Sequence, residues 1–140
     1  IKSIIKQGIK INIIGELNKF SSDLKTVLKK TTKLTNKNKN IIVNLAINYG
    51  SKDEILRALK RSKNNLSVKN IENNLYTKKS PNPDILIRTG GHQRLSNFLL
   101  WQMAYTELFF LKKLWPDFNV NDLTKIIKKY KNIKRNFGKI

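Results

Sequence analysis

The stretch NIIVNLAI, residues 40–47, followed by Asn48-Tyr49-Gly50, indicates the class of fold. It is short, almost continuously apolar and rich in β-branched side chains, which is typical of a strand buried on both faces of a parallel sheet. A second strand of this kind is predicted at residues 9–14, where KINII ends at Gly15. We expect the two strands to lie parallel and adjacent.

Helical patterns alternate with these strands. Apolar residues recur at helical spacing between the strands, behind Ser21 and Ser22 as candidate N-caps; they are Leu24, Val27, Leu28, Thr31 and Leu34. After the second strand, Ser51 and Glu54 have the spacing of a capping box in front of another helix. Residues 62–83 predict a polar loop with a short helix.

The second half of the chain continues the alternation. A third strand is predicted at Ile85–Arg88, then a helix from Ser96 to Met103, a short strand at residues 108–110 and a last helix from Asn119 or Asn121. The predicted fold is α/β in three layers, with a mainly parallel sheet flanked by helices and the first three strands in that sheet. A length of 140 residues fits a single domain, residues 1–140.

Composition limits the chemistry. The chain has no cysteine and one histidine, His92, so thiolate and multi-histidine metal sites are excluded and any metal must be a hard cation held by oxygen. No apolar run reaches the ~18–20 residues of a membrane span, and the first residues lack a signal peptide. The predicted location is cytoplasmic, with peripheral contact to a membrane as an option.

The net charge of +20 raises the alternative of a basic nucleic-acid-binding module. The excess is almost all lysine and accompanies many Asn and Ile residues, as drift in an AT-rich genome produces. The lysines are scattered, and no aromatic residues interleave with them to form a base-stacking platform. Solvated surface charge is the favoured interpretation, with no nucleic acid as a partner.

The end of the third predicted strand carries residues that suit a diphosphate. Arg88 is followed by Gly90-Gly91, Arg94 and Ser96. Guanidinium groups bind phosphate oxygens in bidentate fashion, glycines allow N–H groups to approach, and a helix N-terminus at Ser96 adds to the field. Glu107, expected on the following helix, is the candidate Mg²⁺ ligand beside that diphosphate. Taken singly, these residues equally fit a turn, solvent-facing arginines and a core glutamate.

A longer pattern contains these residues: IRTGG at 87–91, RLSNFLLWQ at 94–102, Ala104-Tyr105, Glu107-Leu108 and WPDF at 115–118. It resembles the C-terminal signature of the cis-prenyltransferases of the undecaprenyl diphosphate synthase type, and the similarity extends over effectively the whole chain. The resemblance implies a transferase of isoprenoid biosynthesis. Such an enzyme condenses isopentenyl diphosphate with an allylic diphosphate such as farnesyl diphosphate, and makes a polyprenyl diphosphate lipid carrier that partitions to the membrane.

The resemblance also implies roles for particular residues. Arg88, Arg94 and Ser96, with Gly90 and Gly91, are expected to bind the diphosphate of isopentenyl diphosphate, and Glu107 is expected to help hold Mg²⁺. In the family, a C-terminal segment reaches into the active site of the partner subunit; here that segment holds Arg135, Phe137 and Gly138. A homodimer is therefore expected.

The sequence also departs from the family pattern. The Met-Asp-Gly-Asn motif, whose aspartate binds Mg²⁺ with the allylic diphosphate, is absent, so the catalytic residue is unknown and the chain is expected to be a C-terminal portion, inactive alone. His92 stands where the family usually has Glu, Ser51-Lys52 where it commonly has Gly-Arg, and Ile133 and Asn136 thin the basic cluster. A non-catalytic partner subunit of a heteromeric enzyme is the alternative, which retention of the site residues disfavours.

Overall fold

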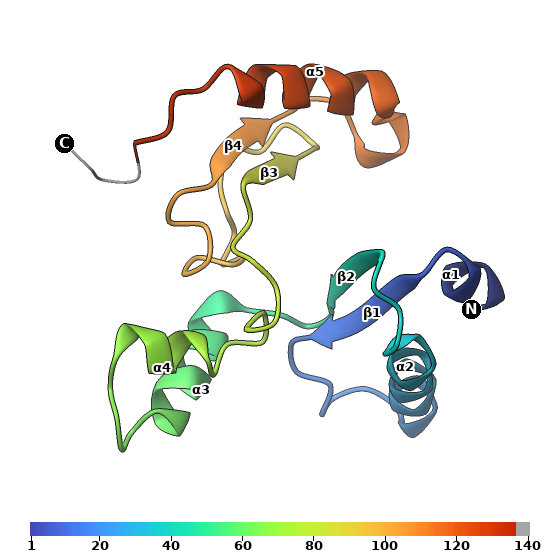
Figure 1. The fold of residues 1–140 in the computed structure, drawn as a ribbon, viewed down its shortest axis with the longest axis vertical. Helices are drawn as coiled ribbons and strands as arrows, with labels where there is room; N and C mark the ends of the chain where they lie inside the picture. The colour runs from blue at the N-terminus through green and yellow to red at the C-terminus, as the bar shows by residue number, and fades with distance from the viewer. Residues whose placement is uncertain (137–140) are drawn as a thin grey trace. The chain divides into compact units, whose positions relative to one another are not determined.

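The computed structural model describes residues 1–136, which divide into two compact units, residues 1–81 and the residues from Asn82 onward. Each unit contains one pair of parallel strands accompanied by helices (Figure 1), so the predicted α/β class with parallel strands is confirmed. The prediction that the first three strands lie in one sheet is wrong, because the third strand pairs with the fourth in a separate two-stranded sheet. The single-domain organisation of residues 1–140 stays a prediction.

The first unit is built on strands β1 (Ile9–Ile14) and β2 (Ile41–Ala46). They pair in parallel and in register, from Ile9 opposite Ile41 to Ile14 opposite Ala46. Two helices pack on β1: α1 (Lys2–Lys6), which the sequence did not predict, and α2 (Ser22–Thr35). Ile11 and Ile14 are buried beneath them.

Polar contacts fix α2 against β1. Ser21 is the N-cap of α2, as predicted, and its hydroxyl accepts a hydrogen bond from the N–H of Leu24. At the other end, the Thr35 side chain is fully buried. Its hydroxyl accepts from the N–H of Ile11 at 3.1 Å and donates to the carbonyl of Thr31 at 2.9 Å. A backbone N–H that the β1–β2 ladder does not use is thereby satisfied by the helix.

Helices α3 (Ser51–Arg61) and α4 (Val68–Glu72) pack against each other in the same unit. The short helix α4 was predicted. The capping box was not correct, because the N-cap of α3 is Gly50 and makes no side-chain capping bond. Glu54 lies on the inward face of the helix instead and is only 1% exposed.

The second unit is built on β3 (Ile85–Arg88) and β4 (Glu107–Phe110). These strands are also parallel, with Ile85 opposite Glu107 and Arg88 opposite Phe110. A 3₁₀ turn, η1 (Trp115–Asp117), and helix α5 (Val120–Lys131) follow. Asn119 caps α5 in a reciprocal capping box with Asp122, which confirms one of the two predicted starts of this helix.

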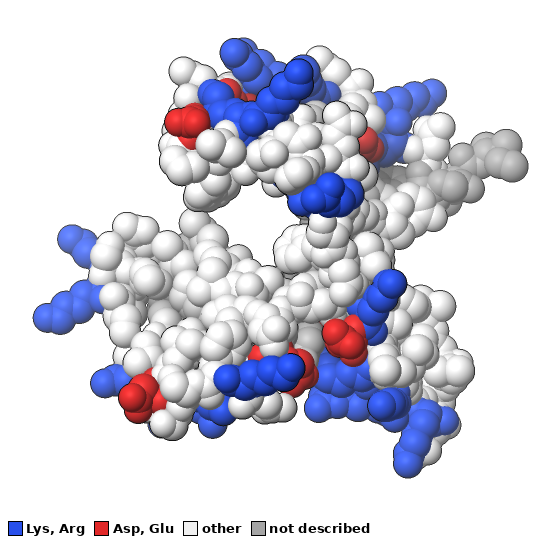
Figure 2. All heavy atoms as spheres, turned by 180° about the vertical axis from the view of Figure 1, so that it is seen from behind, with Lys and Arg blue, Asp and Glu red and all other residues white. Residues whose placement is uncertain are grey.

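Apolar and basic side chains both reach the surface. In the first unit, Leu24, Val27 and Leu34 of α2 and Ile41 and Leu45 of β2 are exposed. On the face shown in Figure 2, lysine and arginine side chains lie on both units and are interspersed with acidic ones. Within residues 1–136, no helix has the length and apolar character to cross a bilayer.

Gly15, directly after β1, provides a test of the first unit. Its φ is +112°, and a Cβ atom at this position would lie 2.2 Å from the carbonyl oxygen of Ile47. Gly15→Ala should destabilise the chain by ~3 kcal/mol or more in urea unfolding, because backbone strain of ~1–3 kcal/mol adds to the overlap with backbone. In the control, Gly90→Ala, φ is +87° but a Cβ would meet nothing within 4 Å. That variant should lose only ~1–2 kcal/mol, and equal losses would contradict the steric explanation.

Candidate functional site

Arg88, the last residue of β3, joins two of the other predicted diphosphate-binding residues. One of its guanidinium nitrogens, Nη1, donates to the Ser96 hydroxyl at 3.0 Å and also to the backbone carbonyl of Arg94. The residues line a cavity of about 300 Å³, together with Leu86, Ile87, Leu95 and Phe98. Arg88 is half-buried, whereas Arg94 and Ser96 are exposed. The structure therefore places two guanidinium-bearing residues and a hydroxyl around one open hollow.

Gly90 and Gly91 shape the loop that follows β3. Their φ angles are +87° and +78°, a region that favours glycine. The Gly90 N–H donates to the carbonyl of Lys113 and the Gly91 N–H to that of Leu111, each at 2.8 Å. These bonds hold the loop to the segment after β4. Both N–H groups are therefore already hydrogen-bonded within the chain. The expectation that they approach a phosphate does not agree with this structure.

Ser96 does not cap a helix. Ser96, Asn97 and Leu99 have φ of +50°, +61° and +45°, whereas a right-handed helix requires φ near −63°. Residues 94–105 form turns and bends rather than the predicted helix. The helix dipole that was expected to strengthen the site is therefore absent at these residues.

Glu107 begins strand β4, so its predicted position on a helix is wrong. Its N–H donates to the carbonyl of Asp84, and it lies opposite Ile85. Because β3 and β4 are parallel, this is the opposite end of the pair from Arg88 and the glycine loop, a separation of ~10 Å along the strand. The structure does not bring Glu107 to Arg88, Arg94 and Ser96.

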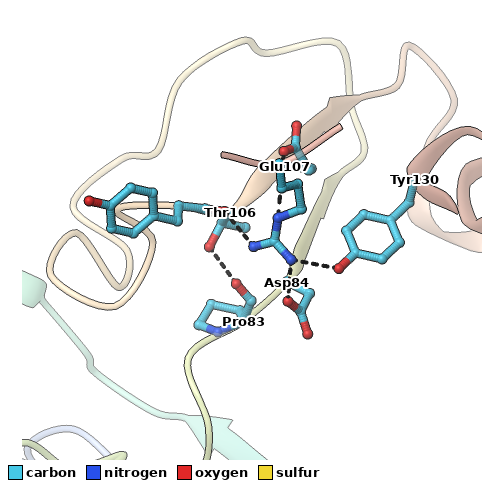
Figure 3. A network of polar contacts seen from close by, with 7 residues as sticks. Pro83, Asp84, Thr106, Glu107 and Tyr130 are labelled. Atoms are coloured by element: carbon cyan, nitrogen blue, oxygen red, sulfur yellow. Dashed lines mark hydrogen bonds and ion pairs between the residues drawn. The ribbon is translucent and has the colours of Figure 1, made fainter. Parts of the chain in front are cut away.

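Glu107 instead lies beside Arg135 (Figure 3). The Glu107 carboxylate is 3.9 Å from the Arg135 Nε, and Asp84 accepts from Arg135 Nη1 at 2.7 Å. Arg135 also donates to the Tyr130 hydroxyl at 2.7 Å and to the carbonyl of Tyr105 at 2.8 Å. The bond from Arg135 holds the pKa of the Asp84 carboxyl below its usual value, and the same bond raises the pKa of Arg135. Asp84 and Tyr130 were not predicted as site residues.

Two further predicted C-terminal residues, Phe137 and Gly138, lie outside the described residues. His92, the departure from the family pattern, is exposed on the loop after Gly91. Arg135 is the member of the predicted C-terminal set whose position can be given. In the structure it contacts carboxylates of its own chain, and its expected role at a partner subunit stays a prediction.

The fit to Mg²⁺ is partial. Glu107 offers the hard oxygen ligand that Mg²⁺ takes, and Mg²⁺ commonly uses one or two carboxylates together with substrate phosphates. Among residues 1–136, however, no group of three or more His, Cys, Asp or Glu side chains is placed to hold a metal ion. In the structure the Glu107 carboxylate instead lies 3.9 Å from the Nε of Arg135. Glu107 as a magnesium ligand therefore stays a prediction.

The sequence did not predict a polar cluster in the first unit. The buried Glu54 accepts from the Tyr49 hydroxyl and, at 2.6 Å, from the Tyr76 N–H. Tyr76 donates its hydroxyl to Glu16 at 2.6 Å, and the Arg57 guanidinium lies 3.8 Å from the centre of its ring. Burial, and then the bond to Glu16, raise the pKa of Tyr76 to about 12. The cluster ties α3 and the segment after α4 to the end of β1.

Comparisons with known proteins agree with the resemblance. The family model for undecaprenyl diphosphate synthase matches residues 1–138. An isoprenyl transferase of Rickettsia typhi is 43% identical over 98% of this chain, which spans 62% of that relative. The ditrans,polycis-undecaprenyl-diphosphate synthase ((2E,6E)-farnesyl-diphosphate specific) of Haemophilus influenzae is 41% identical over 99% of this chain, which again spans 62% of the relative.

Solved structures give the same result. A probable undecaprenyl diphosphate synthase from Campylobacter jejuni superposes with a TM-score of 0.91 and 34% identity, over 99% of this chain and 67% of that one. Lavandulyl diphosphate synthase from Lavandula x intermedia, solved with dimethylallyl diphosphate, also gives 0.91, at 31% identity, over 99% and 64% of the respective chains. The chain belongs to the undecaprenyl diphosphate synthase family of prenyltransferases.

Proposed function

We propose that this chain takes part in cis-prenyl chain elongation, in which isopentenyl diphosphate condenses with an allylic diphosphate to give an undecaprenyl-type diphosphate carrier. The observation that carries the proposal is the hollow at the end of β3, where Arg88, Arg94 and Ser96 come together. Family membership supports the reaction class. The chain contributes the isopentenyl diphosphate half of the site and is the C-terminal portion of a catalytic domain in this proposal.

The three residues have complementary tasks in binding. Arg88 is held by its bonds to Ser96 and to the Arg94 carbonyl, so its guanidinium is oriented before a ligand arrives. Arg94 is exposed at the rim and brings a second positive charge. Ser96 accepts from Arg88, which leaves its own O–H to donate to a phosphate oxygen. Together they form a cationic seat with one neutral donor, which suits a diphosphate more than a single carboxylate.

The reaction itself forms one carbon–carbon bond. The double bond of isopentenyl diphosphate attacks C1 of the allylic partner, the allylic diphosphate leaves, and a proton is lost from the new chain. The residues of this chain hold the diphosphate that is retained in the product. Farnesyl diphosphate is the proposed allylic substrate, and the name of the Haemophilus relative, which specifies farnesyl diphosphate, supports it.

Magnesium belongs to the proposal as the ion that neutralises departing diphosphate, with Glu107 as one carboxylate ligand. We also propose a homodimer, which the exposed apolar residues of α2 and β2 support. We further propose that the protein is cytoplasmic and that its product is released to a membrane. Nucleic acid is not a proposed partner.

Substitution of the arginines tests the diphosphate seat. Arg94→Ala should weaken isopentenyl diphosphate binding, measured by calorimetry, by about ten- to a hundredfold, since a hydrogen bond to a charged group contributes ~1.5–3 kcal/mol. Arg88→Ala should do the same, and Arg→Lys at either position should restore only part, because an ammonium lacks the planar two-pronged geometry. Arg61→Ala, which removes an exposed charge at the end of α3, is the control. Changes below twofold at both positions would refute the seat.

Activity provides a separate test. This chain alone should give no polyprenyl product from radiolabelled isopentenyl diphosphate, farnesyl diphosphate and Mg²⁺. The reason is that residues 1–136 hold no cluster of acidic ligands to anchor a metal with the allylic diphosphate. Binding of isopentenyl diphosphate should still be measurable in the same preparation. Appreciable chain elongation would show that the proposed division of the site is incorrect.

A further inference from the structure

The start of the β3–β4 pair holds a charge arrangement that the proposed diphosphate seat does not use. Asp84 immediately precedes β3 and Glu107 begins β4, so the parallel register places two carboxylates at one end of the pair. The Arg135 guanidinium lies between them, 2.7 Å from the Asp84 oxygen and 3.9 Å from the Glu107 oxygen. Figure 3 shows Asp84, Glu107 and Tyr130 around this guanidinium.

The surroundings of Arg135 show that it is an anchored residue. Its side chain is only 17% exposed, although Lys134 and Asn136 on either side are exposed. It donates to Asp84, to the Tyr130 hydroxyl at the end of α5 and to the Tyr105 carbonyl, and it forms a longer ion pair with Glu107. Such a multiply bonded arginine fixes the short segment after α5 to the strand pair.

We infer that Asp84, Glu107 and Arg135 form a clamp that docks the C-terminal segment on its own chain, and that a divalent cation competes with Arg135 for Glu107. Glu107 is 3.9 Å from the Arg135 Nε in the structure, so a divalent cation bound to this carboxylate would lie close to the guanidinium, and the two positive charges would repel each other. Cation binding at Glu107 therefore weakens the clamp, and release of residues 132–136 is linked to it.

Asp84 and Glu107 have different parts in this device. The Asp84–Arg135 bond is short, while the Glu107 contact is long. Asp84 is therefore the main anchor of Arg135, and the Glu107 contact is the one that a cation can replace. A cation at Glu107 then weakens the hold on Arg135 without breaking the Asp84–Arg135 bond. Only the cation half of the inference rests on the proposed assignment of Glu107 to Mg²⁺. The clamp itself does not depend on the proposed function.

Amide hydrogen exchange of the peptide that covers residues 130–136, measured without substrate, tests the clamp. The amides of Asn132 and Ile133 donate to Lys129 and Tyr130, so they report on the end of α5. Arg135→Gln should speed their exchange by about five- to tenfold, as loss of several hydrogen bonds to an anchored group allows. Lys134→Gln, which removes the neighbouring exposed charge, should leave exchange unchanged. Equal effects of the two variants would overturn the clamp.

A double-mutant cycle and added cation complete the test. Asp84→Asn and Arg135→Gln should be strongly non-additive, because each change removes the same Asp84–Arg135 bond; additive effects would overturn the clamp. In the unsubstituted chain, MgCl₂ should speed exchange by about two- to fivefold over KCl of equal ionic strength, the range expected for a partly exposed ion pair. Glu107→Gln should abolish that difference. No difference in the unsubstituted chain would overturn the competition, whatever isopentenyl diphosphate binding shows.

Discussion

The parallel pairing of β3 with β4 is the constraint on which the site depends. Its register sets Ile85 opposite Glu107 and Arg88 opposite Phe110. In a parallel pair both strands begin at one end and finish at the other. Residues that precede or begin the strands are therefore separated from residues that end or follow them. Arg88 and the loop that carries Ser96 lie at the carboxyl end, whereas Asp84 and Glu107 lie at the amino end with Arg135. The proposed diphosphate seat and the proposed carboxylate clamp therefore lie at opposite ends of one strand pair.

Sequence patterns predicted the features that depend only on neighbouring residues. The strands at residues 9–14 and 85–88 and the caps at Ser21 and Asn119 need only neighbouring residues, and all were found close to where they were expected. The capping box at Ser51 and Glu54 failed for an instructive reason. The Glu54 carboxylate accepts a hydrogen bond from Tyr76, which lies 22 residues away. Leaving a buried carboxylate without hydrogen-bond donors costs more free energy than losing a helix cap, so this long-range contact decides where Glu54 points.

The candidate site was predicted in part for the same reason. Arg88, Arg94 and Ser96 lie within nine residues, so a motif can reveal that they act together. The expected helix after Ser96 did not form, since the left-handed backbone at residues 96, 97 and 99 is incompatible with it. Without that helix, Glu107 begins a strand. The contact between Arg135 and Asp84 spans 51 residues and has no local signal; only the folded chain shows that two carboxylates share this arginine.

The charge of the chain gives the clamp its significance. The chain has 29 basic and 9 acidic residues. Its mean electrostatic field therefore repels a divalent cation and attracts a diphosphate, and many lysine and arginine side chains are available to pair with a carboxylate. The seat at Arg88 needs no special protection under these conditions. A carboxylate that is proposed to bind a metal cation is different, because a nearby lysine or arginine can pair with it instead. Arg135 takes that position with defined geometry, and its long contact to Glu107 leaves that carboxylate the easier of the two to exchange. In the proposed clamp, a side chain of this strongly basic protein therefore occupies the carboxylate that the proposed function assigns to a cation.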